Sequence, residues 1–220
     1  MSTCYGAYRE DVLDRHRQRR IQELRQALQD VDVWAYTDGK LSELDDLMAR
    51  AGVPIPQEIV TRARMARVWE EGCEKFPSER TIRPGSAPVD EVAWMAHYAS
   101  MLPHNVALGR ERALEWLWKL ANSASRLLGE DFDVLGKSLE EYSRAAAKHP
   151  GMTLECDGHT DSTRLFALVE EIGEVAACLT YDNDAETGHG SDLESEVVQV
   201  IALSLAWATR YLGDAEAGNE

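Results

Sequence analysis

Apolar residues recur every three to four positions along most of this 220-residue chain, the spacing of amphipathic helices. No alternation typical of strands persists anywhere, so the pattern predicts an all-α fold, a helical bundle. A proline disfavours helical backbone in the residue before it, so one helix should stop before Pro103. Helices are expected over residues 8–30, 41–51, 57–76, 89–101, 110–128, 133–147, 165–179 and 192–212.

The segment 165–179 combines an apolar stripe with three glutamates. Glu171 and Glu174 are three residues apart, and Glu170 and Glu174 are four apart, so they share a helix face. At an effective dielectric of about 20, two carboxylates about 6 Å apart repel by roughly 3 kcal/mol. A divalent cation reverses that repulsion, and oxygen-only ligands suit Mg²⁺ or Mn²⁺. The stripe consists of Leu165, Leu168, Val169, Ile172, Val175, Ala176 and Leu179.

The segment 192–212 is apolar almost all round, which predicts a buried helix. Glu196 enters this buried region, where an unpaired charge is costly. Placed against Glu171 and Glu174, it would complete an acidic cage that a cation makes tolerable. Such a helix must be covered, so the rest of a four-helix bundle comes from the N-terminal helices or from a second subunit.

The spelling of these two helices resembles a known family. Glu-Glu-x-x-Glu followed after about 20 residues by Glu-x-x-Asp is typical of the all-α nucleoside triphosphate pyrophosphohydrolases of the MazG-like group. Residues 164–179 are similar to that family's first metal helix and 194–207 to its second, with Lys148 to Thr153 as a lead-in. The resemblance covers roughly residues 141–213, with Gln199 in place of the last Asp.

The resemblance implies a Mg²⁺-dependent enzyme that cleaves a nucleoside triphosphate to the monophosphate and pyrophosphate, with Mn²⁺ as a possible substitute. The implied metal ligands are Glu171, Glu174, Glu196 and Gln199, whose amide oxygen brings no charge. Glu170 is a candidate base or a support for a metal ligand. The resemblance also favours a homodimer or higher homo-oligomer. It divides the chain into a helical region of unknown role (1–140), a MazG-like domain (141–213) and a disordered tail (214–220).

The net charge is −16, from 39 acidic and 23 basic residues, and it argues against a nucleic-acid groove, which needs a basic footprint. A nucleotide held through a metal remains compatible with it. No uncharged run of 18 residues is present, so no membrane partner is expected. The four scattered cysteines and the absence of a signal-peptide pattern favour a reduced, cytoplasmic protein.

Several other residues have a functional and a structural interpretation. Lys148, His149 and Arg164 precede the first glutamate stretch and are candidate phosphate-binding residues, with a surface role as the alternative for each. Trp118 and Trp207 are candidates for base stacking, but core packing is the commoner use. Gly173 is expected to allow close helix packing. The stretch 70–74 repeats the Glu-Glu-x-x-Glu spelling, and a solvated helix face is favoured there over a second metal site.

Two alternatives to the enzyme stay open. In the first, the chain is a catalytically weakened, MazG-like protein that binds a nucleotide or a partner, with Gln199 marking the lost charge. In the second, the region of about 140 residues at the N-terminus is a partner-binding module. The sequence names neither the nucleobase nor the sugar.

Overall fold

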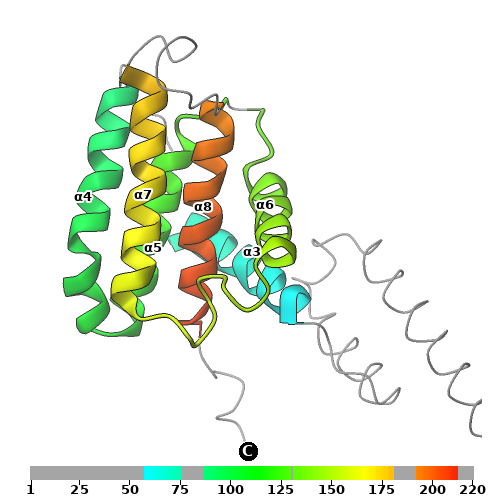
Figure 1. Ribbon diagram of the computed structural model, residues 1–220. Helices are drawn as coiled ribbons and strands as arrows, with labels where there is room; N and C mark the ends of the chain where they lie inside the picture. The colour runs from blue at the N-terminus through cyan, green and yellow to red at the C-terminus, as the bar shows by residue number, and fades with distance from the viewer. Residues whose placement is uncertain (1–56, 76–86, 130, 181–191, 213–220) are drawn as a thin grey trace, which may run out of the picture. The chain divides into compact units, whose positions relative to one another are not determined.

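The computed structural model describes residues 57–75, 87–129, 131–180 and 192–212, and its regular elements are all α-helices (Figure 1). The predicted all-α bundle is therefore confirmed for the described residues. The helices expected over 8–30 and 41–51 and the tail at 214–220 lie outside them. The helices are α3 (Gln57–Lys75), α4 (Pro88–Ala107), α5 (Arg110–Ser125), α6 (Val134–Lys148), α7 (Asp161–Thr180) and α8 (Leu193–Thr209).

Four of these helices close into a bundle. α4 packs against α5, α5 against α8, α8 against α7, and α7 against α4. α3 and α6 pack against another side of α8, which places α8 in the middle of this unit (Figure 1). Each helix thus covers part of the apolar surface that its neighbour would otherwise expose to water.

The core is built around α8, as its sequence predicts. Its side chains from Val197 to Thr209 are buried except for Gln199 and Leu203. The helices that pack against α8, which are α3, α5, α6 and α7, come from the same chain, so a second subunit is not needed to bury α8. The compact unit to which these helices belong begins at Gln57.

α4 does not end where the sequence predicts. It runs through Pro103 to Ala107, although an interior proline lacks a hydrogen-bond donor and costs about 3 kcal/mol. Leu102 is fully buried beside the proline, and Asn105 is buried one turn further on. The Asn105 Nδ2 also donates to the Met101 carbonyl at 2.9 Å. Burial of Leu102 and Asn105 on either side of Pro103 outweighs the local penalty of the proline.

Both candidate stacking tryptophans belong to the core. Trp118 and Trp207 are each 1% exposed. Trp118 lies on α5 so close to α3 that a Cβ added at Gly72 would fall 2.0 Å from its ring. Gly72 is therefore required by helix packing, and neither ring is available to stack on a base.

A buried ion pair joins α4 to α5. Glu91 is 4% exposed, and its Oε2 accepts hydrogen bonds from Arg126 Nε and Ser123 Oγ, each at 2.9 Å. The neighbouring Asp90 accepts from the Ala87 backbone N–H at 3.1 Å, as expected of an acid in a first helical turn. Glu91 instead forms a buried ion pair, which the sequence did not indicate. Among the described residues, no helix is long and apolar enough to cross a membrane.

Candidate metal centre

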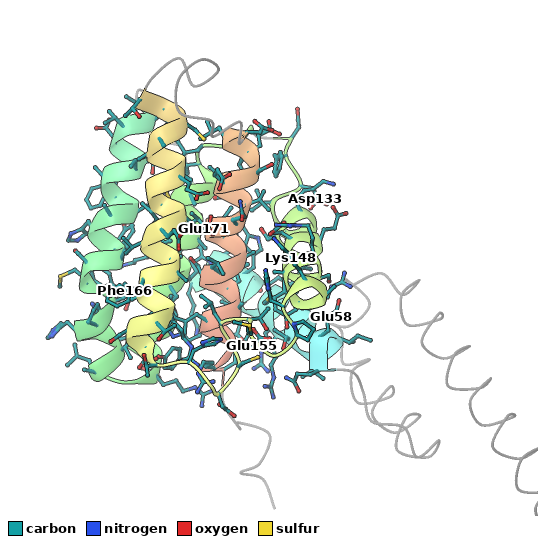
Figure 2. All side chains as sticks on the ribbon, viewed as in Figure 1. Glu58, Asp133, Lys148, Glu155, Phe166 and Glu171 are labelled. Carbon is teal, nitrogen blue, oxygen red and sulfur yellow. The ribbon has the colours of Figure 1, made fainter. Side chains whose placement is uncertain are left out.

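Three glutamates from two helices meet where α7 packs against α8. Glu171 and Glu174 come from α7 and Glu196 from the first turn of α8. One carboxylate oxygen of each lies within 4.8 Å of those of the other two. The structure therefore brings together the three carboxylates that the sequence predicts as metal ligands (Figure 2 shows Glu171 on the α8 side of α7).

Glu196 is the most deeply placed of the three, with 4% of its surface exposed. Its Oε2 accepts a hydrogen bond from Gln199 Nε2 at 2.8 Å. The first turn of a helix carries a partial positive charge from unpaired N–H groups, which favours a carboxylate there. The amide and the helix end offset part of the cost of burying Glu196, but neither supplies a full positive charge.

The burial and mutual repulsion of these carboxylates change the pKa of Glu171. Burial, followed by the charges of Glu174, Glu196 and Glu170, raises the pKa of Glu171 from 4.5 to about 7. Its Oε2 is buried and makes no hydrogen bond with any described residue. A buried oxygen with no partner is costly and is a position where a cation would be favourable.

The residues present fit a divalent cation of the Mg²⁺ or Mn²⁺ type. All three groups are carboxylates, the hard oxygen ligands that these ions prefer. The unsatisfied Glu171 Oε2 gives such an ion a ligand atom that no described group already uses. No other group of three or more histidine, cysteine, aspartate or glutamate side chains is close enough to hold a metal within the described ranges.

A cavity of about 290 Å³ adjoins Glu171. It lies between α6 and α7, both of which pack against α8, and α8 forms its apolar floor. Of the three clustered glutamates, Glu171 lines it, beside the neutral amide of Gln199. The remaining lining residues are Glu141, Tyr142, Arg144, Ala145, Lys148, His149, Thr153, Leu154, Ala202, Leu203 and Ala206.

The wall of the cavity formed by α6 carries two cations, Arg144 and Lys148, and one acid, Glu141. Arg144, Lys148 and His149 all line it and are all exposed. Glu141 holds the Arg144 guanidinium through two hydrogen bonds of 2.6 and 2.7 Å. Those bonds raise the pKa of Arg144, and the charge of Glu171 raises it further. The cavity thus places cationic donors opposite a carboxylate centre, an arrangement suited to a phosphate chain that also carries a metal ion.

The loop between α6 and α7 completes the cavity and is fixed by two arginines. Arg164 is 2% exposed, and it donates to the carbonyls of Leu154 and Cys156, each at 2.6 Å. Arg210, after α8, donates to the Glu155 carbonyl at 2.7 Å. Arg164, a predicted phosphate ligand, therefore directs its donors at the backbone of its own chain and does not line the cavity. Lys148 and His149, the other candidates, do line it.

The Glu155 side chain ties this loop to α6. Its Oε1 accepts from the Tyr142 hydroxyl at 2.5 Å and from Thr153 Oγ1 at 2.7 Å. Burial raises the pKa of the Tyr142 hydroxyl, and the hydrogen bond to Glu155 raises it further, so the phenol stays protonated. Tyr142 and Thr153 are thereby held along the wall of the cavity.

Other predicted features of α7 fall outside the site. Glu170 is exposed and does not line the cavity. A Cβ at Gly173 would meet nothing within 4 Å in the described chain, so the prediction that Gly173 allows close helix packing is wrong within this unit. The apolar stripe is narrower than predicted, since Val169 is 48% exposed and Leu179 36% exposed.

The second Glu-Glu-x-x-Glu stretch, on α3, is a charged helix surface. Glu71 pairs with Arg67 at 2.6 Å and with Lys75 at 3.7 Å. These i, i+4 pairs neutralise the carboxylate within its own helix. The same spelling therefore has opposite surroundings on α3 and on α7, and the structure supports the solvated interpretation of the α3 copy.

Sequence reasoning missed Arg144 as a wall of the cavity. Glu141, Arg144, Ala145 and Lys148 recur at spacings of three and four, which places them on one face of α6. That face directly precedes the predicted metal unit, so the signal was present in the spacing. Comparison with known proteins adds nothing further: no family model, no curated protein and no solved structure matches this chain.

Proposed function

We propose that this chain is a Mg²⁺-dependent nucleotide pyrophosphohydrolase that cleaves a nucleoside triphosphate to the monophosphate and pyrophosphate. The observation that carries the proposal is the meeting of three glutamate carboxylates, one of which, Glu171, lines a cavity that also carries Lys148 and Arg144 on its α6 wall. Carboxylates alone would repel the phosphates of a nucleotide. Cations alone would attract the phosphates, but they would not explain why three glutamates cluster beside them. Their combination suits a substrate that arrives as a metal complex.

Each group has a distinct part in this proposal. Glu171, Glu174 and Glu196 would hold the ion, which supplies neutralisation of phosphate charge and a more acidic water when it is bound. Lys148 and Arg144 bind phosphate oxygens from the α6 side, and Glu141 orients the Arg144 guanidinium. In the hydrolysis, water oxygen bonds to the α-phosphorus, the bond from that phosphorus to the bridging oxygen breaks, and pyrophosphate leaves with the bridging oxygen.

The resemblance of residues 141–213 to the MazG-like group supports the same reaction. The three motif glutamates meet in space as that resemblance requires. Gln199 favours a second candidate, a catalytically weakened nucleotide-binding protein, because it supplies an amide where the family spelling has a carboxylate. The two candidates differ in turnover and share the metal.

The test is a panel of nucleoside triphosphates, incubated with the full chain and Mg²⁺ and assayed for pyrophosphate by ³¹P NMR. We expect release by the wild type and none above background by Glu171→Ala. Glu71→Ala is the matched control, since Glu71 has the same place in the second Glu-Glu-x-x-Glu stretch but pairs with Arg67 and Lys75. Equal release by wild type and Glu171→Ala would refute the enzyme and leave the binding protein.

A further inference from the structure

Gln199 touches the carboxylate centre as a hydrogen-bond donor. It lies three residues after Glu196, on the same face of α8, and its Nε2 donates to Glu196 Oε2 at 2.8 Å. The Gln199 side chain can turn either its Nε2 or its Oε1 toward Glu196. Turning it round would place Oε1 against a carboxylate oxygen, so the charge of Glu196 fixes the nitrogen toward it. Gln199 also lines the cavity, beside Glu171.

This hydrogen bond has a consequence for charge. An aspartate at position 199 would be a fourth acceptor and would repel Glu196, whereas the amide attracts it. With glutamine there, the centre has three carboxylates and therefore at most three negative charges. One divalent cation leaves a net charge near −1 at full ionisation, while a second cation would make the centre positive.

We propose that Gln199 is a positioning residue: its Nε2 holds the Glu196 carboxylate for the metal and, by leaving the centre with three carboxylates, restricts it to one divalent cation per chain. The inference rests on the proposed metal site at Glu171, Glu174 and Glu196. It differs from the ligand role that the sequence resemblance implies for Gln199. In that role the amide oxygen would turn to the ion and the bond to Glu196 would be given up.

The experiment measures Mn²⁺ binding to the full chain, by electron paramagnetic resonance for stoichiometry and calorimetry for affinity. We expect one ion per chain for the wild type. Gln199→Met keeps the length of the side chain but removes the donor, and should weaken binding about 10- to 100-fold at unchanged stoichiometry. Gln199→Asp adds a carboxylate and should bind two ions. Leu203→Met, also in the cavity wall on α8, is the control and should match the wild type.

The outcomes separate this inference from the proposed function. Two ions in the wild type, or unchanged affinity in Gln199→Met, would overturn the inference while the metal site stands. Tighter binding of a single ion by Gln199→Asp would also overturn it, because that result is expected if residue 199 is itself a ligand. No Mn²⁺ bound by the wild type would overturn both proposals. Thermal unfolding followed by circular dichroism shows that each variant is folded before binding is measured.

Discussion

Two glutamates of this protein are equally buried but have opposite surroundings. Glu91, between α4 and α5, and Glu196, at the start of α8, are each 4% exposed. Glu91 accepts hydrogen bonds from the Arg126 guanidinium and the Ser123 hydroxyl. Glu196 lies against the neutral amide of Gln199 and within 4.8 Å of carboxylate oxygens of Glu171 and Glu174.

The difference distinguishes a charge that the chain itself compensates from one for which we propose a bound cation. A buried carboxylate is tolerated when positive charge or hydrogen bonds compensate it. At Glu91 the compensation is part of the chain, so the pair is complete without a ligand. At the three glutamates of the metal centre, added carboxylates increase the repulsion, and the compensation that we propose comes from a bound cation.

Removal of Arg126 should have the largest effect on stability. Arg126→Met leaves Glu91 buried without its cation, and breaking a buried pair from one side costs about 3 to 5 kcal/mol. For a folded unit of this size, that loss lowers the melting temperature by roughly 6 to 20 °C, measurable by calorimetry. Addition of Mg²⁺ should not restore the loss, because the pair joins α4 to α5 and includes none of the proposed metal ligands.

The double variant Glu91→Gln with Arg126→Met is the control for this prediction. It removes both charges and keeps an acceptor for the Ser123 hydroxyl, so most of the lost stability should return. If Arg126→Met melts like the wild type, the Glu91 pair is not a structural charge pair and the contrast with the metal centre fails.

Mg²⁺ should stabilise the wild type, and the gain should depend on the glutamates of the metal centre. Binding only to the folded state adds about 2.7 kcal/mol at a Mg²⁺ concentration 100 times Kd. The melting temperature should then rise by roughly 5 to 11 °C. Glu171→Gln and Glu174→Gln should abolish the rise, whereas Arg126→Met should keep it. An unchanged wild-type melting temperature in millimolar Mg²⁺ would contradict the metal site.

The fold was predictable where local pattern and tertiary packing agree. α8 is apolar almost all round, so its burial and the helical bundle around it followed from the sequence. The extent of α4 did not, because burial of Leu102 and Asn105 outweighs the local effect of Pro103. The Glu91–Arg126 pair could not be predicted either, because the two residues are 35 positions apart and no helical spacing connects them.

Protonation of Glu171 gives a smaller effect, which depends on pH. Its pKa is about 7 when folded and 4.5 otherwise, so between these values the folded chain binds the extra proton. Stability from this group is therefore present at low pH and lost as pH rises from about 4.5 to 7. Without divalent ions, Glu171→Gln should remove this fall, which we expect to be about 1 to 2 kcal/mol after allowance for solvent screening.

The measurement is chemical denaturation of wild type and Glu171→Gln at several pH values in the presence of a chelator. Each protein gives a curve of unfolding free energy against pH, and the difference between the two curves is the contribution of Glu171 alone. Glu71→Gln, on the surface of α3, is the control and should leave the wild-type curve unchanged. If the free energies of unfolding of wild type and Glu171→Gln differ by a constant amount from pH 4 to pH 8, the neighbouring carboxylates do not raise the pKa of Glu171 in the folded state.

The candidate site was only partly predictable for a related reason. Glu171, Glu174 and Glu196 carry a spacing signal, and the structure brings them together. Arg164 has no such signal to distinguish a guanidinium that faces a ligand from one that binds the backbone, and here it binds the carbonyls of Leu154 and Cys156. Sequence patterns locate charges on helix faces, but the partner that each charge meets depends on the packing of loops and helices.

Replacement of Lys148 should give the smallest effect and tests the cationic side of the contrast. Arg126 is committed to Glu91, whereas Lys148 lines the cavity and is available to a phosphate oxygen. Because Lys148 is exposed, Lys148→Ala should leave the free energy of unfolding within about 0.5 kcal/mol of the wild-type value. It should raise KM for the triphosphate about five- to tenfold, the loss of a single charge-assisted contact at a solvated site.

Lys137→Ala is the matched control, since Lys137 lies on the same helix but pairs with Glu140 at 2.9 Å. Equal KM values for both variants would mean that the α6 wall of the cavity does not meet the substrate, and the phosphate chain would then have to lie elsewhere around the three glutamates.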